Sequence, residues 1–357
     1  MRIAQISPLY ESVPPRLYGG TERIVAYLAD ALTDLGHEVT LFASGDSHTK
    51  AELVPVRDQA IRLDPYALKS DLADHLAMLD QVRQRADEFD VLHFHTDVLH
   101  FPLFEDMAAR TLTTIHGRLD LKGLAKAYRR WPQFPLVSIS DQQRKPLHFA
   151  NWISTVHHGL PDDVLRPAAR PAGDYLAFLG RISPEKRCDR AIEVAKQCGM
   201  RLKIAAKIDA GDRAYYEERI EPLIDGRQIV YIGEINEHQK SEFLGNAAAL
   251  LFLIDWPEPF GLTMIESMAC GTPVVGWRCG SVPEVIEDGV TGEVVDTEDQ
   301  AVEAVKRVIA LKRHTIREAW ELRFSAKIMA RKYVTLYERA PAASALTTEA
   351  AARLAVI

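Results

Sequence analysis

The sequence is poor in cysteine and has no long apolar run. Four cysteines occur in 357 residues, without C-x-x-C spacing or the density of a disulfide-stabilised domain: Cys188, Cys198, Cys270 and Cys279. No stretch approaches the ~20 consecutive apolar residues that a transmembrane helix needs. Met1 leads directly into Arg2–Ser7, which has the pattern of a buried strand and not of a signal peptide. These absences predict a cytoplasmic protein with reduced thiols.

Basic residues are also fewer than acidic residues. Lys and Arg number 43 against 50 Asp and Glu, which gives a formal net charge of −7. An acidic chain has no general attraction for nucleic acid, so such a role would need a local basic patch. With 47% apolar and 26% charged residues, the chain has the composition of a folded protein and the length for two ordinary domains.

Short apolar runs alternate with segments of helical period, which is typical of β-α-β units and mainly parallel sheets. In the first half the predicted strands cover 2–7, 38–43, 91–95, 111–115, 136–139 and 152–156. In the second half they cover 175–179, 202–205, 228–232, 249–253 and 273–276. Between the first two strands, a stripe of apolar residues at helical spacing stops at Gly36. The pattern predicts an α/β protein with two doubly wound domains.

A segment rich in Pro, Ala and Gly separates the two halves. It predicts an N-terminal domain at 1–165, a linker at 166–174 and a second domain at 175–315. Apolar periodicity over 316–340 predicts one or two C-terminal helices, which can cross back to the first domain. The Ala- and Thr-rich end, 341–357, is expected to be a frayed tail.

Loops that follow parallel strands are the first places to look for a binding site. Gly19 and Gly20 precede a predicted helix start, where glycine lets backbone amides approach an anion, although a tight turn explains them equally well. Gly180, Arg181 and Lys186 follow a strand end and present two cations to which a diphosphate can bind. A solvated loop with a local ion pair is the alternative for this second segment.

The third loop contains two carboxylates eight residues apart, Glu258 and Glu266, the second of them on a predicted helix. A carboxylate can accept hydrogen bonds from two neighbouring hydroxyls of a ribose or a hexose. The amides of Phe260, Gly261 and Leu262 can donate to a sugar or a phosphate. A solvated pair of glutamates is the alternative interpretation.

These segments carry a resemblance to a known family. The E-x7-E element from Glu258 to Glu266, followed by Ala269–Val275, resembles the donor-site signature of glycosyltransferase family 4, retaining enzymes of the GT-B fold. Further segments agree in order and spacing: Gly19–Gly20, Leu35–Val39, Phe178–Arg181 with Lys186, Gly280–Ile286 and Asp288–Gly292. The resemblance covers residues 1–335 and is most specific over 178–292. It implies two Rossmann-like domains that face each other across a cleft, and a hexosyltransferase activity.

The resemblance also implies roles for single residues. Glu266 would contact the ribose of the nucleotide, and Glu258 a hydroxyl of the donor sugar. Arg181 and Lys186 would hold the diphosphate, and Gly20 would approach it from the first domain. The implied donor is a nucleotide-sugar; UDP-sugars are favoured by their frequency in the family, with ADP- and GDP-sugars as alternatives. The acceptor is a hydroxyl of unidentified class.

His116, at the end of the strand at 111–115, is implied to lie beside the transferred sugar and to stabilise positive charge at the anomeric carbon. The leaving diphosphate needs positive charge on its own side. The chain has no D-x-D motif that would bind a metal, so Arg181, Lys186 and helix-end amides are the available charge. We therefore predict catalysis without a metal or other cofactor. No carboxylate is a convincing nucleophile for a covalent route, which favours front-face substitution.

His93, His95 and His100 with Asp97 form the densest histidine cluster of the sequence. A zinc site would need further ligands, and none appear at compact spacing. We favour the interpretation that these residues end strands at the cleft, with His95 on the acceptor side.

A second cluster is basic and spans 118–131, where a helix is predicted: Arg118, Lys122, Lys126, Arg129 and Arg130. A solvated face is the favoured interpretation, and contact with a membrane surface or an anionic acceptor is the alternative. Arg118 is the acceptor-side candidate of this segment.

Two other functions fit parts of these motifs. A nucleotide-sugar epimerase or phosphorylase would use a similar double domain but not the E-x7-E element with its cations. A catalytically silent nucleotide-sugar-binding module would keep Arg181, Lys186 and Glu266 and would not need His116. Tight donor binding without transfer or donor hydrolysis would indicate the silent module.

Overall fold

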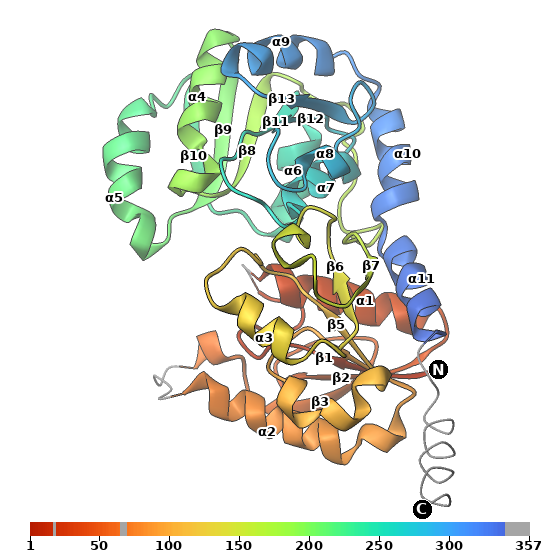
Figure 1. The fold of residues 1–357 in the computed structure, drawn as a ribbon. Coiled ribbons are helices and arrows are strands. Elements are labelled where there is room, and N and C mark those ends of the chain that lie inside the picture. Colours follow the sequence, from red (N-terminus) through yellow and green to blue (C-terminus); the bar gives the residue numbers. More distant parts are fainter. Residues whose placement is uncertain (17–18, 65–69, 340–357) are drawn as a thin grey trace, which may run out of the picture. The chain divides into compact units, whose positions relative to one another are not determined.

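The computed structural model describes residues 1–16, 19–64 and 70–339. They form two compact units, drawn in Figure 1. Unit 1 comprises Met1–Gly159 and the segment that begins at Ala326, and unit 2 comprises Leu160–Ser325. The tail predicted at 341–357 lies outside the described residues.

Unit 1 is built on a parallel sheet of seven strands in the order β3-β2-β1-β4-β5-β6-β7. The strands are β1 (Arg2–Ile6), β2 (Glu38–Ser44), β3 (Glu52–Arg57), β4 (Val91–Phe94), β5 (Thr111–Thr114), β6 (Leu136–Ser138) and β7 (Trp152–Thr155). The chain progresses from β1 to one edge and then from β4 to the other edge. The topological switch point therefore lies between β1 and β4, where doubly wound sheets bind ligands beyond the carboxyl ends of their strands.

The longer helices of unit 1 are α1 (Gly20–Asp34), α2 (Asp71–Gln84), α3 (Leu124–Arg130) and α11 (Ala326–Tyr337). Helix α1 buries the predicted apolar stripe, and Gly36, just beyond its end, has a left-handed φ of 86°. Helix α11 packs against α1, and Figure 1 shows the two side by side. The last described helix therefore belongs to unit 1.

Unit 2 is built on a second parallel sheet, of six strands in the order β10-β9-β8-β11-β12-β13. The strands are β8 (Tyr175–Arg181), β9 (Arg201–Lys207), β10 (Ile229–Gly233), β11 (Ala249–Phe252), β12 (Val274–Trp277) and β13 (Gly292–Val295). The helices are α4 (Cys188–Gln197), α5 (Arg213–Tyr215), α6 (Glu237–Gly245), α7 (Leu262–Ala269), α8 (Val282–Val285), α9 (Glu298–Val308) and α10 (Arg313–Phe324). The switch point of this sheet lies between β8 and β11.

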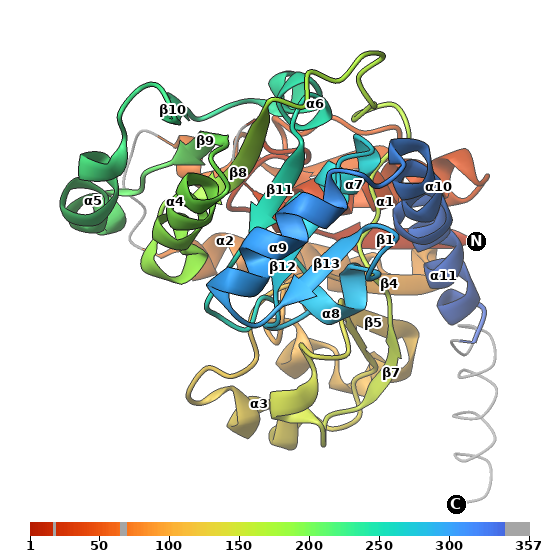
Figure 2. The ribbon, with the colours of Figure 1, turned by 90° about the horizontal axis from the view of Figure 1, so that it is seen from above.

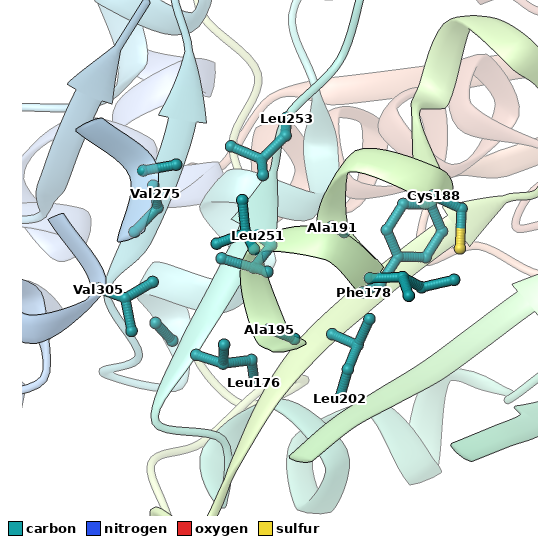
Figure 3. Close-up of a cluster of buried hydrophobic side chains, with 14 of the residues drawn as sticks. Leu176, Phe178, Cys188, Ala191, Ala195, Leu202, Leu251, Leu253, Val275 and Val305 are labelled. Carbon is teal, nitrogen blue, oxygen red and sulfur yellow. The ribbon is translucent and has the colours of Figure 1, made fainter. Parts of the chain in front are cut away.

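The main core of unit 2 lies between one face of this sheet and the helices α4 and α9, which Figure 2 shows across the strands. Side chains that alternate along β8 and β11 meet the apolar faces of both helices. Figure 3 shows Leu176, Phe178 and Leu251 of the strands together with Val305 of α9. Cys188 is part of this core, and burial raises the pKa of its thiol. Because α7 packs on β11 and β12 without joining this cluster, the carboxylates of the E-x7-E segment are kept apart from the main core.

The division between the units falls before the predicted linker at 166–174. The amide of Leu160 donates to the carbonyl oxygen of Phe324 at 2.9 Å, and Arg317 Nη1 donates to the carbonyl oxygen of Leu165 at 2.9 Å. The segment 160–165 is therefore tied to α10 in unit 2. At the other end, unit 2 includes α10 and ends at Ser325, so the chain passes back to unit 1 between α10 and α11.

Two strands and one helix differ from the sequence prediction. The strands β3 and β13 were not predicted: Pro55 breaks the apolar pattern within β3, and β13 has only four residues, half of them partly exposed. The helix predicted over 118–131 covers only Leu124–Arg130, because Gly123 has a left-handed φ of 95° and begins it late. Among the described residues, no helix is both long and apolar enough to cross a membrane.

Candidate active site

Two of the predicted segments meet at the carboxyl edge of the unit 2 sheet. Lys186 Nζ donates a hydrogen bond to Glu258 Oε2 at 2.5 Å, and the pair is largely buried. The amide of Asp255 donates to the carbonyl oxygen of Glu185 at 2.8 Å. The Gly-Arg loop after β8 and the loop after β11 are thus in direct contact.

Glu258 is held by more than Lys186. Trp256 Nε1 donates to the same oxygen, Oε2, at 2.9 Å, and the Lys186 ammonium lies 4.4 Å from the centroid of the Trp256 ring. A Cβ atom on Gly280 would lie 2.4 Å from the backbone N and O of Glu258, so only glycine fits there. Trp256 was missed in the sequence, although it stands two residues before Glu258.

Gly261 sets the start of α7. It has a left-handed φ of 81°, and a Cβ there would lie 2.7 Å from Met264 Cε and 3.0 Å from Phe252 Cζ. Ser281 Oγ donates to the carbonyl oxygen of Phe260 at 2.8 Å and fixes the loop before it. The helix that begins at Leu262 therefore presents its N-terminal amides, with their partial positive charge, at a defined place.

Glu266 lies on α7 and is only 3% exposed. Lys240 Nζ from α6 donates to Glu266 Oε1 at 2.7 Å, and it also lies 3.4 Å from Glu237 Oε2. A carboxylate buried to this extent needs such a partner. Lys240 was not predicted, because a single lysine on a polar helix has no local signal.

Arg181 is surrounded by carboxylates. Its guanidinium lies 2.9 Å from Glu185 Oε1, 3.4 Å from Asp209 Oδ2 and 4.0 Å from Asp212 Oδ2. Hydrogen bonds from Lys207 and then Arg181 lower the pKa of Asp209. A diphosphate at Arg181 must therefore compete with these carboxylates. Around Gly180 a Cβ would meet no atom within 4 Å, so the backbone there is accessible.

In unit 1, His116 follows β5 and is bonded to a second histidine. His116 Nε2 and His95 Nδ1 are 2.8 Å apart, and the His116 ring stacks on that of His158 with centroids 5.2 Å apart. Gln143 Nε2 donates to the carbonyl oxygens of Ile115 and Gly117, both at 2.8 Å, and so fixes the backbone on either side of His116. Burial lowers the pKa of His116 to about 3. His116 is therefore a neutral imidazole in the folded protein.

The remaining histidines of the cluster bind other side chains. His93 is bonded to Tyr337 and Thr114, and His100 Nε2 lies 3.0 Å from Thr113 Oγ1. Within the described ranges, no group of three or more His, Cys, Asp and Glu side chains is arranged to hold a metal ion.

The two other predicted segments of unit 1 have local partners. Gly19 caps α1, and a Cβ there would lie 2.8 Å from Pro15 Cβ, so packing alone requires this glycine. Gly20 is the first residue of α1. Arg118 forms an ion pair with Asp120 at 2.6 Å, in the stretch before α3 that is not helical.

Comparison with known proteins identifies this architecture. Residues 18–166 match the glycosyltransferase family 4 description, and residues 167–323 match the glycosyl transferases group 1 description. The D-inositol 3-phosphate glycosyltransferase of Mycolicibacterium smegmatis is 28% identical over 330 residues, which is 79% of this chain and 76% of that protein.

Solved structures share the fold. AviGT4, a glycosyltransferase involved in avilamycin A biosynthesis, is 24% identical with a TM-score of 0.71, covering 95% of this chain and 97% of that one. Anabaena HepE in complex with UDP-glucose is 14% identical with a TM-score of 0.72, covering 95% and 99%. The fold and these matches define a GT-B glycosyltransferase.

More narrowly, the two matches cover 18–323, and the chain belongs to the family 4 type of glycosyltransferases. The predictions of the fold, the family and a transferase activity are confirmed.

Proposed function

We propose that this glycosyltransferase moves a hexose-type sugar from a nucleoside diphosphate sugar to a hydroxyl acceptor, with retention of anomeric configuration and without a metal. The observation that carries the proposal is the Lys186–Glu258 ion pair, which unites the Gly-Arg loop and the E-x7-E segment in unit 2. UDP-sugars are the favoured donors, since solved structures of Anabaena HepE are complexes with UDP and UDP-glucose.

The charged groups of unit 2 bind the nucleotide end of the donor. Arg181 and Lys186 compensate the diphosphate, together with the amides at the N-terminus of α7. Glu266, held in place by Lys240, accepts hydroxyl hydrogens of the ribose. Glu258 accepts from a hydroxyl of the sugar that is transferred.

Retention is proposed to follow a front-face substitution. The bond between the anomeric carbon and the diphosphate oxygen breaks, and the bond to the acceptor oxygen forms on the same face of the sugar. The acceptor proton passes to the departing phosphate oxygen, so that no protein nucleophile is needed. His116 hydrogen-bonds the sugar while positive charge develops at the anomeric carbon.

Thermal unfolding with UDP, ADP and GDP tests the donor assignment, because only a ligand that prefers the folded state raises the melting temperature. We expect the largest rise with UDP. Glu266→Gln should abolish this rise, and Glu303→Gln, an exposed glutamate of the same unit, should preserve it. An undiminished rise in the Glu266→Gln protein would show that the ribose assignment is wrong.

A transfer assay tests the reaction. Inositol 3-phosphate is the first acceptor to try, because the M. smegmatis relative is named for it. We expect a product whose anomeric configuration, read by NMR, equals that of the donor, and an unchanged rate in EDTA. Inversion, or a rate that EDTA removes and a divalent cation restores, would contradict the mechanism. Donor binding with neither transfer nor hydrolysis would indicate a silent binding module instead.

A further inference from the structure

A buried hydrogen-bond chain ends at His116. It includes Gln5, which lies near the end of β1 with no exposed surface. Gln5 Oε1 lies 2.8 Å from His95 Nε2, and Gln5 Nε2 donates to the Tyr337 hydroxyl at 3.1 Å. An amide oxygen can only accept, so His95 Nε2 carries a hydrogen and donates to Gln5.

The direction of this bond determines the next one. A neutral imidazole carries one N–H, so His95 Nδ1 is an acceptor. His116 Nε2, 2.8 Å away, must then carry the hydrogen and donate to it. His116 Nδ1 is left with a lone pair, and this buried atom has no hydrogen-bond partner in the part of the chain that the structure describes.

Tyr337 on α11 contacts the Gln5 amide. Its hydroxyl accepts from Gln5 Nε2 and can donate to His93 Nδ1, which is 2.7 Å from the hydroxyl and 3.3 Å from Gln5 Nε2. His93 Nε2 then donates to Thr114 Oγ1, also at 2.7 Å. In this direction the ring N–H of each of His93, His95 and His116 has an acceptor. If the Gln5 amide were rotated so that Oε1 and Nε2 exchanged places, these hydrogen bonds would reverse direction and the hydrogen of His116 would lie on Nδ1.

We propose that Gln5 and Tyr337 are positioning residues that hold His116 in the tautomer whose Nδ1 accepts a hydrogen bond, and that this atom accepts from a hydroxyl of the transferred sugar. The second half of this statement rests on the proposed function. The chemistry favours the tautomer, because a lone pair stabilises nearby positive charge at the anomeric carbon and an N–H would oppose it.

The tautomer is measured directly by NMR of the full chain labelled with ¹⁵N-histidine, in which protonated and unprotonated ring nitrogens have well-separated shifts. The spectrum of a His116→Gln protein assigns the His116 signals by their loss. We expect a hydrogen on Nε2 of His116 and none on Nδ1. The opposite assignment in the wild-type protein would overturn the proposal, and this reading needs neither a variant at Tyr337 nor a donor.

Tyr337→Phe tests the positioning role, with Tyr333→Phe as the matched control. Both changes remove a buried phenol oxygen from α11, but Tyr333 is bonded to Thr114 at 2.8 Å and not to Gln5. We expect Tyr337→Phe to give a mixture of His116 tautomers and to lower kcat about tenfold, the equivalent of one hydrogen bond, with little change in the KM for donor.

Tyr333→Phe should change neither the tautomer nor kcat. An unmixed tautomer in the Tyr337→Phe protein, or equal mixing in both variants, would refute the role of Tyr337. Failure of the proposed function has a different signature, since it would abolish turnover in the wild-type protein and leave the His116 spectrum as expected.

Discussion

The ion pair between Lys240 and Glu266 offers a test of the donor site that does not require the substrate. The two atoms are 2.7 Å apart, and the side chains are 14% and 3% exposed. Removing one partner of a buried pair costs about 3–5 kcal/mol, because the other charge is left without a partner. The partial exposure of Lys240 places Lys240→Met at the lower end, about 3 kcal/mol.

For a unit the size of unit 2, this loss corresponds to a melting temperature lower by about 6–12 °C. The double variant Lys240→Met with Glu266→Gln contains no unpaired buried charge, so we expect it to melt above Lys240→Met alone. Lys306→Met is the control, since Lys306 and its partner Glu303 are 60% and 58% exposed at a distance of 2.6 Å. That exposed pair should contribute little.

The assay is thermal unfolding by circular dichroism, with urea unfolding as a second measure. A Lys240→Met protein as stable as the wild type would mean that Glu266 is not held as a buried ion. A double variant that melts no higher than Lys240→Met would refute the argument from an unpaired charge, and the cost would then have to lie in lost packing.

Three further changes have defined outcomes. Gly261→Ala places a Cβ 2.7 Å from Met264 Cε at a φ of 81°, and should cost about 1–3 kcal/mol in urea unfolding; an unchanged midpoint would contradict it. Because burial lowers the pKa of His116 from 6.5 to about 3, the unfolded chain binds more protons between these values, so stability should fall as the pH is lowered through this window, and His116→Gln should reduce the slope. Glu185→Gln removes a carboxylate 2.9 Å from Arg181 and should increase the thermal shift produced by UDP; a smaller shift would show that Glu185 does not compete with the ligand.

The sequence predicted the parts of this protein that repeat or that cluster locally. Apolar runs gave the central strands of both sheets, and the E-x7-E element with the Gly-Arg loop indicated the edge where Lys186 and Glu258 meet. Of the four edge strands, β7 and β10 were predicted, and β3 and β13 were missed because their side chains are partly exposed and their apolar pattern is weak. The basic segment at 118–131 was over-extended as a helix because charge and apolar spacing do not reveal the left-handed Gly123.

Site residues with distant partners had no signal in the sequence. Gln5 and Tyr337 are 332 positions apart, and Lys240 and Glu266 belong to different helices. In the sequence alone, a single polar residue inside an apolar strand, such as Gln5, only interrupts the apolar pattern that predicts the strand. Only the register that sets Gln5 opposite His93 on β4 shows that it belongs to a polar chain.

The polar groups of the two units are held in different ways, and this difference bears on what each can bind. In unit 2 the cations Arg181, Lys186 and Lys240 are each paired with a carboxylate, so an anionic ligand that binds these cations competes with the carboxylates. In unit 1, His116 is a neutral imidazole bonded to His95, so it offers a hydrogen-bonding group without charge. Such competition suits the proposed reaction, in which the diphosphate must dissociate, because the carboxylates can then pair with the cations again. In the proposed reaction the sugar carries positive charge only in the transition state. A neutral hydrogen-bond acceptor such as His116 would stabilise that state more than it stabilises the bound substrate.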